Sequence, residues 1–276
     1  MDFKTLNIIP SEPISKMEST IAMEREAHRL RAEGKIDQAF QAFERAAKKY
    51  QDLGEHRKAA ACYASAAACW NIHTGWQPLR NAATRNELAA IQAFEAKDYA
   101  YTETLFHEAA LLYEKEGDFR KYSYCYIRSQ DARLMRLWKT FTQGSAGQGP
   151  EAIHLSGISF KERFLIFSKW FLGSLHGFIW GYGEKPFRVL GLAAGVIFFS
   201  ALFYHFSGMI LTGGFVQKIG FGESLYLSMI TYTTVGYGDY LPMGWVRGIA
   251  AAEALSGILF TPLFLIAMAR RYLRMS

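Results

Sequence analysis

Seven residues in the last third of the chain, Thr-Thr-Val-Gly-Tyr-Gly-Asp at 233–239, carry groups that could hold a bare ion. In an extended loop, the carbonyl oxygens of residues 234–237 and the Thr234 hydroxyl can replace the water shell of a dehydrated cation. Successive carbonyls face one side only where the backbone alternates in handedness, which Gly236 and Gly238 permit because glycine has no Cβ. Gly-Tyr-Gly alone is more often a simple turn. The interpretation of residues 233–239 as an ion-binding loop therefore depends on the segments that flank them.

Long apolar segments flank this run on both sides. Val189 to Ile210 and Trp245 to Met268 are each close to the ~20 residues that a bilayer-spanning helix needs. Between them, residues 223–233 contain no helix breaker and are long enough to enter a membrane and return, but too short to cross it. The carbonyl end of such a short helix directs partial negative charge towards a central cavity, where it favours a cation.

Basic residues mark the inner ends of both apolar segments. Lys185 and Arg188 precede the first segment, and Arg270, Arg271 and Arg274 follow the second. Because cytoplasmic flanks are enriched in Lys and Arg, we predict a multi-pass protein of the cell (inner) membrane with both termini in the cytoplasm. The 233–239 loop would then face outward.

Together these features resemble the two-transmembrane potassium channels of prokaryotes, from about Gly181 to the end of the chain. The resemblance implies a homotetramer in a lipid bilayer, with K⁺ as the permeant ion and no cofactor. It places a pore domain at 184–276, with an outer helix at about 186–210, a pore helix at about 222–233 and an inner helix at about 244–269.

The resemblance also assigns individual residues. The K⁺ selectivity filter, within a segment at 234–239, is assigned to Thr234, Val235, Gly236, Tyr237 and Gly238, and the flanking filter support to Thr233 and Asp239. Gly257 matches the glycine at which inner helices commonly bend. Pro262 removes a backbone N–H nearby and favours a bend at the same level, so we predict that both form a gating hinge.

Four positions depart from the family pattern or add to it. Ile230 stands where some relatives have a glutamate that shares a proton with the aspartate at position 239, so Asp239 needs another partner. Tyr226 and Leu227 stand where many relatives have a tryptophan pair. Glu253 lies within the inner helix, where it either lines the cavity and attracts cations or forms a buried hydrogen bond to a neighbouring helix.

Residues 1–142 have a different character, since small and apolar residues recur there at helical spacing. Breaks containing a glycine fall at 33–35, 53–55 and 116–118, and Lys-Asp-Tyr at 97–99 breaks the pattern without one. We predict six helices paired into three antiparallel hairpins, which makes the whole chain all-α. The phrase Ala-Ala-Cys-Tyr-Ala-Ser-Ala-Ala at 60–67 resembles the helix pairs of tetratricopeptide and SNAP-like repeats.

A helical-repeat domain offers a concave surface, so a peptide, protein or small-ligand regulator is a candidate partner. Cys62, Cys69 and Cys125 lie inside helical patterns without metal-ligand spacing and are predicted to be core thiols in a reducing cytosol. The aromatic stretch from Trp70 to Arg80 is interpreted as either a ligand pocket or, with more weight, a cap on the core.

Several classes of function are not supported by the sequence. The histidines and glutamates belong to no catalytic motif, so we do not predict an enzyme. The formal net charge is only +6, and no Lys/Arg run is interleaved with aromatic residues, so we predict no nucleic-acid partner.

Two segments connect the halves. Residues 143–157 have the composition of a flexible linker. Residues 158–183 are apolar and aromatic but interrupted by charges, and as a third span they would place Lys169 near the middle of the bilayer. We therefore predict an amphipathic helix on the inner membrane surface.

The sequence as a whole predicts a potassium-selective channel that is gated or modulated by its N-terminal helical domain. Because the chain ends at Ser276, shortly after the inner helix, we expect control to come from the N-terminal side. The alternative is a membrane-anchored helical-repeat scaffold with a non-conducting or weakly selective pore. Cation flux distinguishes the two.

Overall fold

The computed structural model describes residues 12–72, 77–143 and 160–275. The chain divides into two compact units, Met1–Leu172 and Gly173–Ser276. Helices dominate both units, which confirms the all-α prediction. The linker predicted at 143–157 lies outside the described residues from position 144 onward.

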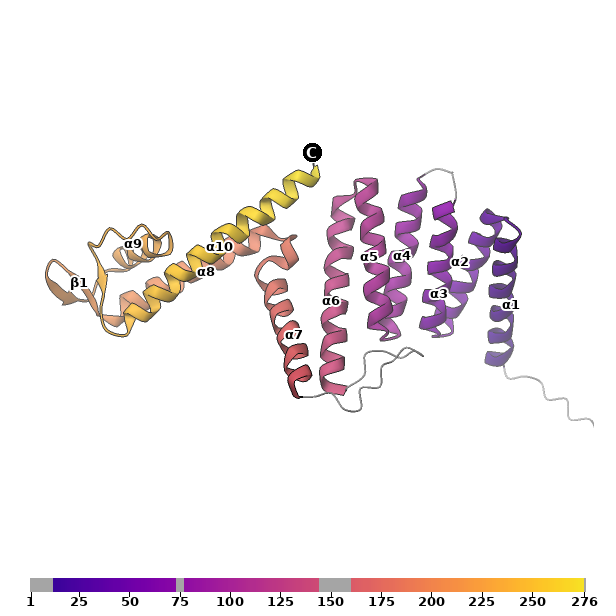
Figure 1. The fold of residues 1–276 in the computed structure, drawn as a ribbon, viewed down its shortest axis with the longest axis horizontal. Coiled ribbons are helices and arrows are strands. Elements are labelled where there is room, and N and C mark those ends of the chain that lie inside the picture. The colour runs from indigo at the N-terminus through magenta and orange to yellow at the C-terminus, as the bar shows by residue number, and fades with distance from the viewer. Residues whose placement is uncertain (1–11, 73–76, 144–159, 276) are drawn as a thin grey trace, which may run out of the picture. The chain divides into compact units, whose positions relative to one another are not determined.

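The first unit contains a row of six helices, each packed against the next (Figure 1). These are α1 (Glu12–Ala32), α2 (Ile36–Asp52), α3 (His56–Ile72), α4 (Pro78–Glu95), α5 (Tyr99–Glu116) and α6 (Phe119–Gln143). Three of the turns place a glycine in the left-handed region, at Gly34, Gly54 and Gly117. The turn between α4 and α5 uses Lys97 instead, with φ 57°.

The six helices form two copies of a three-helix unit. Equivalent residues differ by 63 positions, as in Glu24 and Glu87, Tyr50 and Tyr113, Lys58 and Lys121, and Cys62 and Cys125. In each copy the tyrosine hydroxyl donates to the glutamate, at 2.6 Å in the first and 2.8 Å in the second. The lysine ammonium lies 5.6 Å from the tyrosine ring centroid in both. The three predicted helix pairs, α1–α2, α3–α4 and α5–α6, are all packed together, and α2–α3 and α4–α5 pack as well, within a duplication that the sequence analysis did not predict.

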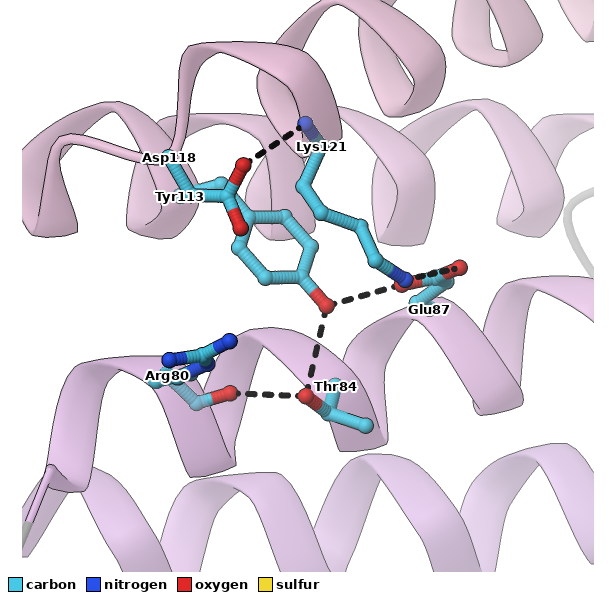
Figure 2. Close-up of polar contacts among 6 residues, drawn as sticks. All are labelled: Arg80, Thr84, Glu87, Tyr113, Asp118 and Lys121. Carbon is cyan, nitrogen blue, oxygen red and sulfur yellow. Dashed lines mark hydrogen bonds and ion pairs between the residues drawn. The ribbon is translucent and has the colours of Figure 1, made fainter.

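Figure 2 shows the polar cluster of the second copy. The Tyr113 hydroxyl donates to Glu87 and lies 3.2 Å from the Thr84 hydroxyl. The Lys121 ammonium lies 2.9 Å from the same Glu87 carboxylate, and the Lys121 backbone N–H donates to Asp118 at 3.1 Å. The cluster therefore joins α4, α5 and the first turn of α6.

The core of this unit is built from small and aromatic side chains. Cys62 and Cys125 are 1% and 0% exposed within it, and burial raises the pKa of both thiols to about 12. Both are therefore protonated at neutral pH. In the parts of the chain that are described, no group of three or more His, Cys, Asp and Glu side chains could hold a metal ion.

Helix α7 (Phe160–Trp180) passes from the first unit into the second and is followed by a 3-10 turn at Gly181–Gly183. The second unit continues with α8 (Pro186–Ser207), α9 (Phe221–Tyr232) and α10 (Val246–Met275). Figure 1 shows α8 and α10 running side by side, with the short α9 packed at one end. Both long helices are apolar enough to cross a membrane, over Pro186–Ser207 and Val246–Arg271.

A small antiparallel sheet, which the sequence analysis did not predict, lies beside α9. It contains β1 (Ile210–Thr212), β2 (Phe215–Gln217) and β3 (Leu241–Pro242) in the order β2-β1-β3. Helix α8 ends earlier than expected because Gly208 adopts φ 62°. Strand β3 pairs with β1 directly after the 233–239 loop, so the sheet holds the far end of that loop.

Candidate functional site

Helix α9 positions the near end of the 233–239 loop. It begins after Gly220, whose backbone N–H donates to the Glu223 carboxylate at 2.7 Å. At its other end, the N–H groups of Val235 and Gly236 both donate to the Ile230 carbonyl, at 2.9 and 3.1 Å. The loop therefore leaves directly from the last turn of the helix.

The loop backbone alternates in handedness. Gly236 and Gly238 have φ of 53° and 82°, which is the conformation that sequence reasoning required of these glycines. Thr234 also lies in the left-handed region, with φ 58°. A β-branched residue rarely adopts this conformation, and the sequence analysis did not predict it.

All the predicted filter and support residues, 233–239, are exposed in a single chain. The side chains of Val235 and Tyr237 are 53% and 73% exposed. The loop of a single chain therefore cannot surround an ion by itself.

The flank of the loop contains a pair of neighbouring polar groups that the sequence analysis missed. The Tyr226 hydroxyl lies near the carboxylate of Asp239, to which it can donate. The ring of Tyr226 also packs edge-on against Tyr240, with centroids 5.9 Å apart, and the Tyr240 hydroxyl donates to Glu223 at 3.4 Å. Tyr226 can therefore supply the partner that Asp239 needs. The available signal in the sequence was a tyrosine, whose hydroxyl can donate a hydrogen bond, at position 226, where many relatives carry tryptophan.

Glu253 lies behind α9, away from solvent. It is 2% exposed, and it accepts a hydrogen bond of 2.6 Å from the Tyr204 hydroxyl of α8. The hydroxyls of Ser228 in α9 and Ser200 in α8 also contact its carboxylate. In the single chain this corresponds to the second of the two interpretations of Glu253, a buried hydrogen bond to neighbouring helices. Glu253 therefore joins α8, α9 and α10.

Gly257 lies where α10 packs closely on the end of α9. A Cβ atom built at this position would lie 1.9 Å from the carbonyl oxygen of Tyr232, the last residue of α9. No side chain fits there without displacing one of the helices. The predicted hinge position is therefore also a packing contact directly below the loop.

The other predicted hinge residue, Pro262, lies inside α10, which continues as one helix to Met275. In the aromatic stretch of the first unit, Trp70 packs edge-on against Phe40, with ring centroids 5.2 Å apart. This contact matches the core-cap interpretation for Trp70, whereas residues 73–76 of that stretch lie outside the described residues.

Comparison with known proteins identifies the C-terminal region. Residues 191–274 match the family model described as "Ion channel". Protein LctB of Bacillus caldotenax and Protein LctB of Geobacillus stearothermophilus are each 60% identical to the chain over 35 residues, which is 13% of this chain and 26% of each relative. The chain thus matches about a quarter of the length of these relatives. No solved structure matches it.

The matched region contains most of α8, all of α9, the 233–239 loop and nearly all of α10. It thus includes most of the first candidate membrane span, all of the second and every residue assigned to ion contact. The C-terminal region of this chain therefore carries an ion-channel domain.

Proposed function

We propose that the chain is one subunit of a homotetrameric, potassium-selective channel of the cell membrane, with both termini in the cytoplasm. The observation that carries this proposal is the Thr-Val-Gly-Tyr-Gly loop, which has left-handed glycines at Gly236 and Gly238 and leaves directly from the end of α9. Carbonyl oxygens stacked along such a loop replace the hydration shell of K⁺.

The exposure of the loop supports assembly around an axis. Residues 233–239 present their groups to solvent in one chain, and a cage of oxygens requires several copies. The long helices also expose large apolar side chains, such as Phe199 at 62% and Ile258 at 58%. Lipid and neighbouring subunits would cover these surfaces.

Flux through purified protein tests this function. In liposomes, the wild-type protein should carry K⁺ and Rb⁺ and exclude Na⁺. Gly236→Ala should abolish the flux, because a methyl group opposes the left-handed backbone there. The N-terminal unit should keep its helical circular dichroism in this variant. A folded wild-type protein without flux would instead favour the scaffold function.

The first unit is proposed to gate or modulate this pore. Its core is separate from that of the second unit, and none of the residues assigned to ion contact belongs to it. Helix α7 continues from this unit into the next and exposes large apolar side chains, among them Phe164 at 64% and Phe178 at 68%. Such a surface suits the membrane interface, and α7 would then carry the coupling.

A further inference from the structure

The two copies of the three-helix unit differ at one strained turn. Gly34 and Lys97 are equivalent at the offset of 63 positions, and both are left-handed, with φ of 77° and 57°. Glycine adopts this conformation freely, whereas a lysine does so at a cost in free energy. Strained residues of this kind cluster at binding sites, so the residues around Lys97 form a candidate binding site.

Lys97 lines a cavity of about 710 Å³ within the first unit. Arg128 and Lys139 of α6 line it as well, whereas Asp131 is the single carboxylate among its described lining residues. Aromatic rings complete the wall, including Trp138, which is 44% exposed. The volume lies within the range of small-molecule sites, and the charge favours an anion.

Two of the cationic groups lie against aromatic rings. Arg128 lies over the rings of Phe94 and Phe106, at 5.3 and 5.8 Å from their centroids, and its buried Nε has no hydrogen-bond partner. The Lys139 ammonium lies 5.7 Å from the centroid of Tyr99. Among the described residues, neither Lys97 nor Lys139 forms an ion pair with a carboxylate.

The basic character is specific to the second copy. Gly34 and Ser65 occupy the positions equivalent to Lys97 and Arg128. Core packing does not explain why the second copy has a lysine and an arginine at these two positions. Lys97 is exposed, so it does not pack in the core, and Arg128 leaves a buried hydrogen-bond donor unpaired. A ligand that accepts hydrogen bonds explains both.

We infer that this cavity binds a phosphorylated small molecule, with its phosphate oxygens held by Lys97, Arg128 and Lys139 and an apolar or aromatic body against Trp138. Guanidinium and ammonium groups are the side chains that best satisfy phosphate oxygens. A nucleoside phosphate and the headgroup of an anionic phospholipid both have this chemistry. Binding itself does not depend on ion conduction, whereas an effect of the ligand on gating rests on the proposed channel function.

The test is a titration of the full-length protein in detergent, followed by intrinsic fluorescence, because Trp138 and Trp170 both line the cavity. The probes are adenosine diphosphate, inorganic pyrophosphate and short-chain phosphatidic acid. Saturable binding of adenosine diphosphate or pyrophosphate would indicate a soluble ligand, and binding of phosphatidic acid alone would indicate a lipid. No saturable binding of any probe would overturn the inference.

Two variants separate a binding role from a structural one. Lys97→Gly should weaken binding about tenfold while leaving the unfolding temperature unchanged or higher, because glycine relieves the left-handed strain. Lys139→Gln should weaken binding similarly. Lys115→Gln, an exposed lysine of α5 outside the cavity, is the matched control and should have no effect. Equal affinity in the wild type and both cavity variants would contradict the assignment.

Flux measured in liposomes with the same probes addresses regulation separately. A change in K⁺ flux that Lys97→Gly removes would support a regulatory site. Binding without any change in flux would overturn the regulatory role but not the site. Absence of flux under all conditions would contradict the channel proposal and leave the binding result standing.

Discussion

The two units of the chain bury their apolar residues in different ways. In the first unit, large side chains such as Tyr50 and Phe106 are buried completely or nearly so within the row of six helices. In the second unit, α8 and α10 leave large apolar side chains exposed, and the loop at 233–239 is exposed as well. The first unit thus has a closed core of its own, whereas the second exposes surfaces that lipid and further copies of the chain would cover in the proposed channel.

The largest effect is expected where the second unit packs most tightly. Gly257→Ala places a methyl group 1.9 Å from the Tyr232 carbonyl oxygen, so α10 must move away from α9. We expect loss of K⁺ flux and of the tetramer in size-exclusion chromatography. The matched control is Gly248→Ala in the same helix, where a Cβ meets no atom within 4 Å. If both variants kept flux and assembly, the packing role of Gly257 would be wrong and only a hinge role would remain.

A smaller effect is expected at the buried carboxylate that joins the three helices. Glu253→Gln replaces one acceptor oxygen with an NH₂ donor facing the Tyr204 and Ser228 hydroxyls. A buried group left unpaired costs about 1–3 kcal/mol. We expect a tetramer that dissociates at lower temperature and a pore that is less selective.

The control for Glu253 is Ser256→Ala, because the Ser256 hydroxyl donates only to a backbone carbonyl in its own helix, at 2.7 Å. It should leave tetramer stability and selectivity unchanged. Equal stability of Glu253→Gln and the wild type would mean that the carboxylate does not hold the helices together.

A third effect concerns the flank of the loop. Tyr226→Phe removes the hydroxyl that lies near the Asp239 carboxylate and keeps the ring that packs on Tyr240. The fold should persist, and currents should decline faster during sustained opening because Asp239 has lost its partner. Tyr240→Phe should have a weaker effect, since the bond of the Tyr240 hydroxyl goes to Glu223 rather than to Asp239 and is long, at 3.4 Å. Identical current decay in Tyr226→Phe and the wild type would exclude this support.

The smallest effect concerns the first unit and its pH dependence. Because burial raises the pKa of the Cys62 and Cys125 thiols to about 12, both should resist maleimide between pH 7 and pH 9 until the protein unfolds. Their ordinary pKa is about 9, so above that pH the unfolded chain loses these protons first. The stability of this unit should therefore fall as pH rises from about 9 towards 12. Rapid labelling of the native protein at pH 7 would show that the core is not closed.

Local patterns in the sequence were sufficient for the two candidate spans and for the left-handed glycines of the 233–239 loop. That loop is a run of adjacent residues, and the conformations of Gly236 and Gly238 depend on their own backbone angles. The partners of Glu253 could not be predicted, because Tyr204 is 49 residues away and the bond depends on how three helices pack. The duplication was also hidden, since only scattered positions such as Glu24 and Glu87 are preserved between the copies.

The most direct test of the central claim is the reversal potential of purified protein in a planar bilayer, with K⁺ on one side and Na⁺ on the other. If the Thr234 to Gly238 carbonyls form the cation cage, the reversal potential should lie far towards the value for a membrane permeable only to K⁺, and Gly236→Ala should carry no current. A reversal potential near zero, with equal permeability to K⁺ and Na⁺, would contradict the account.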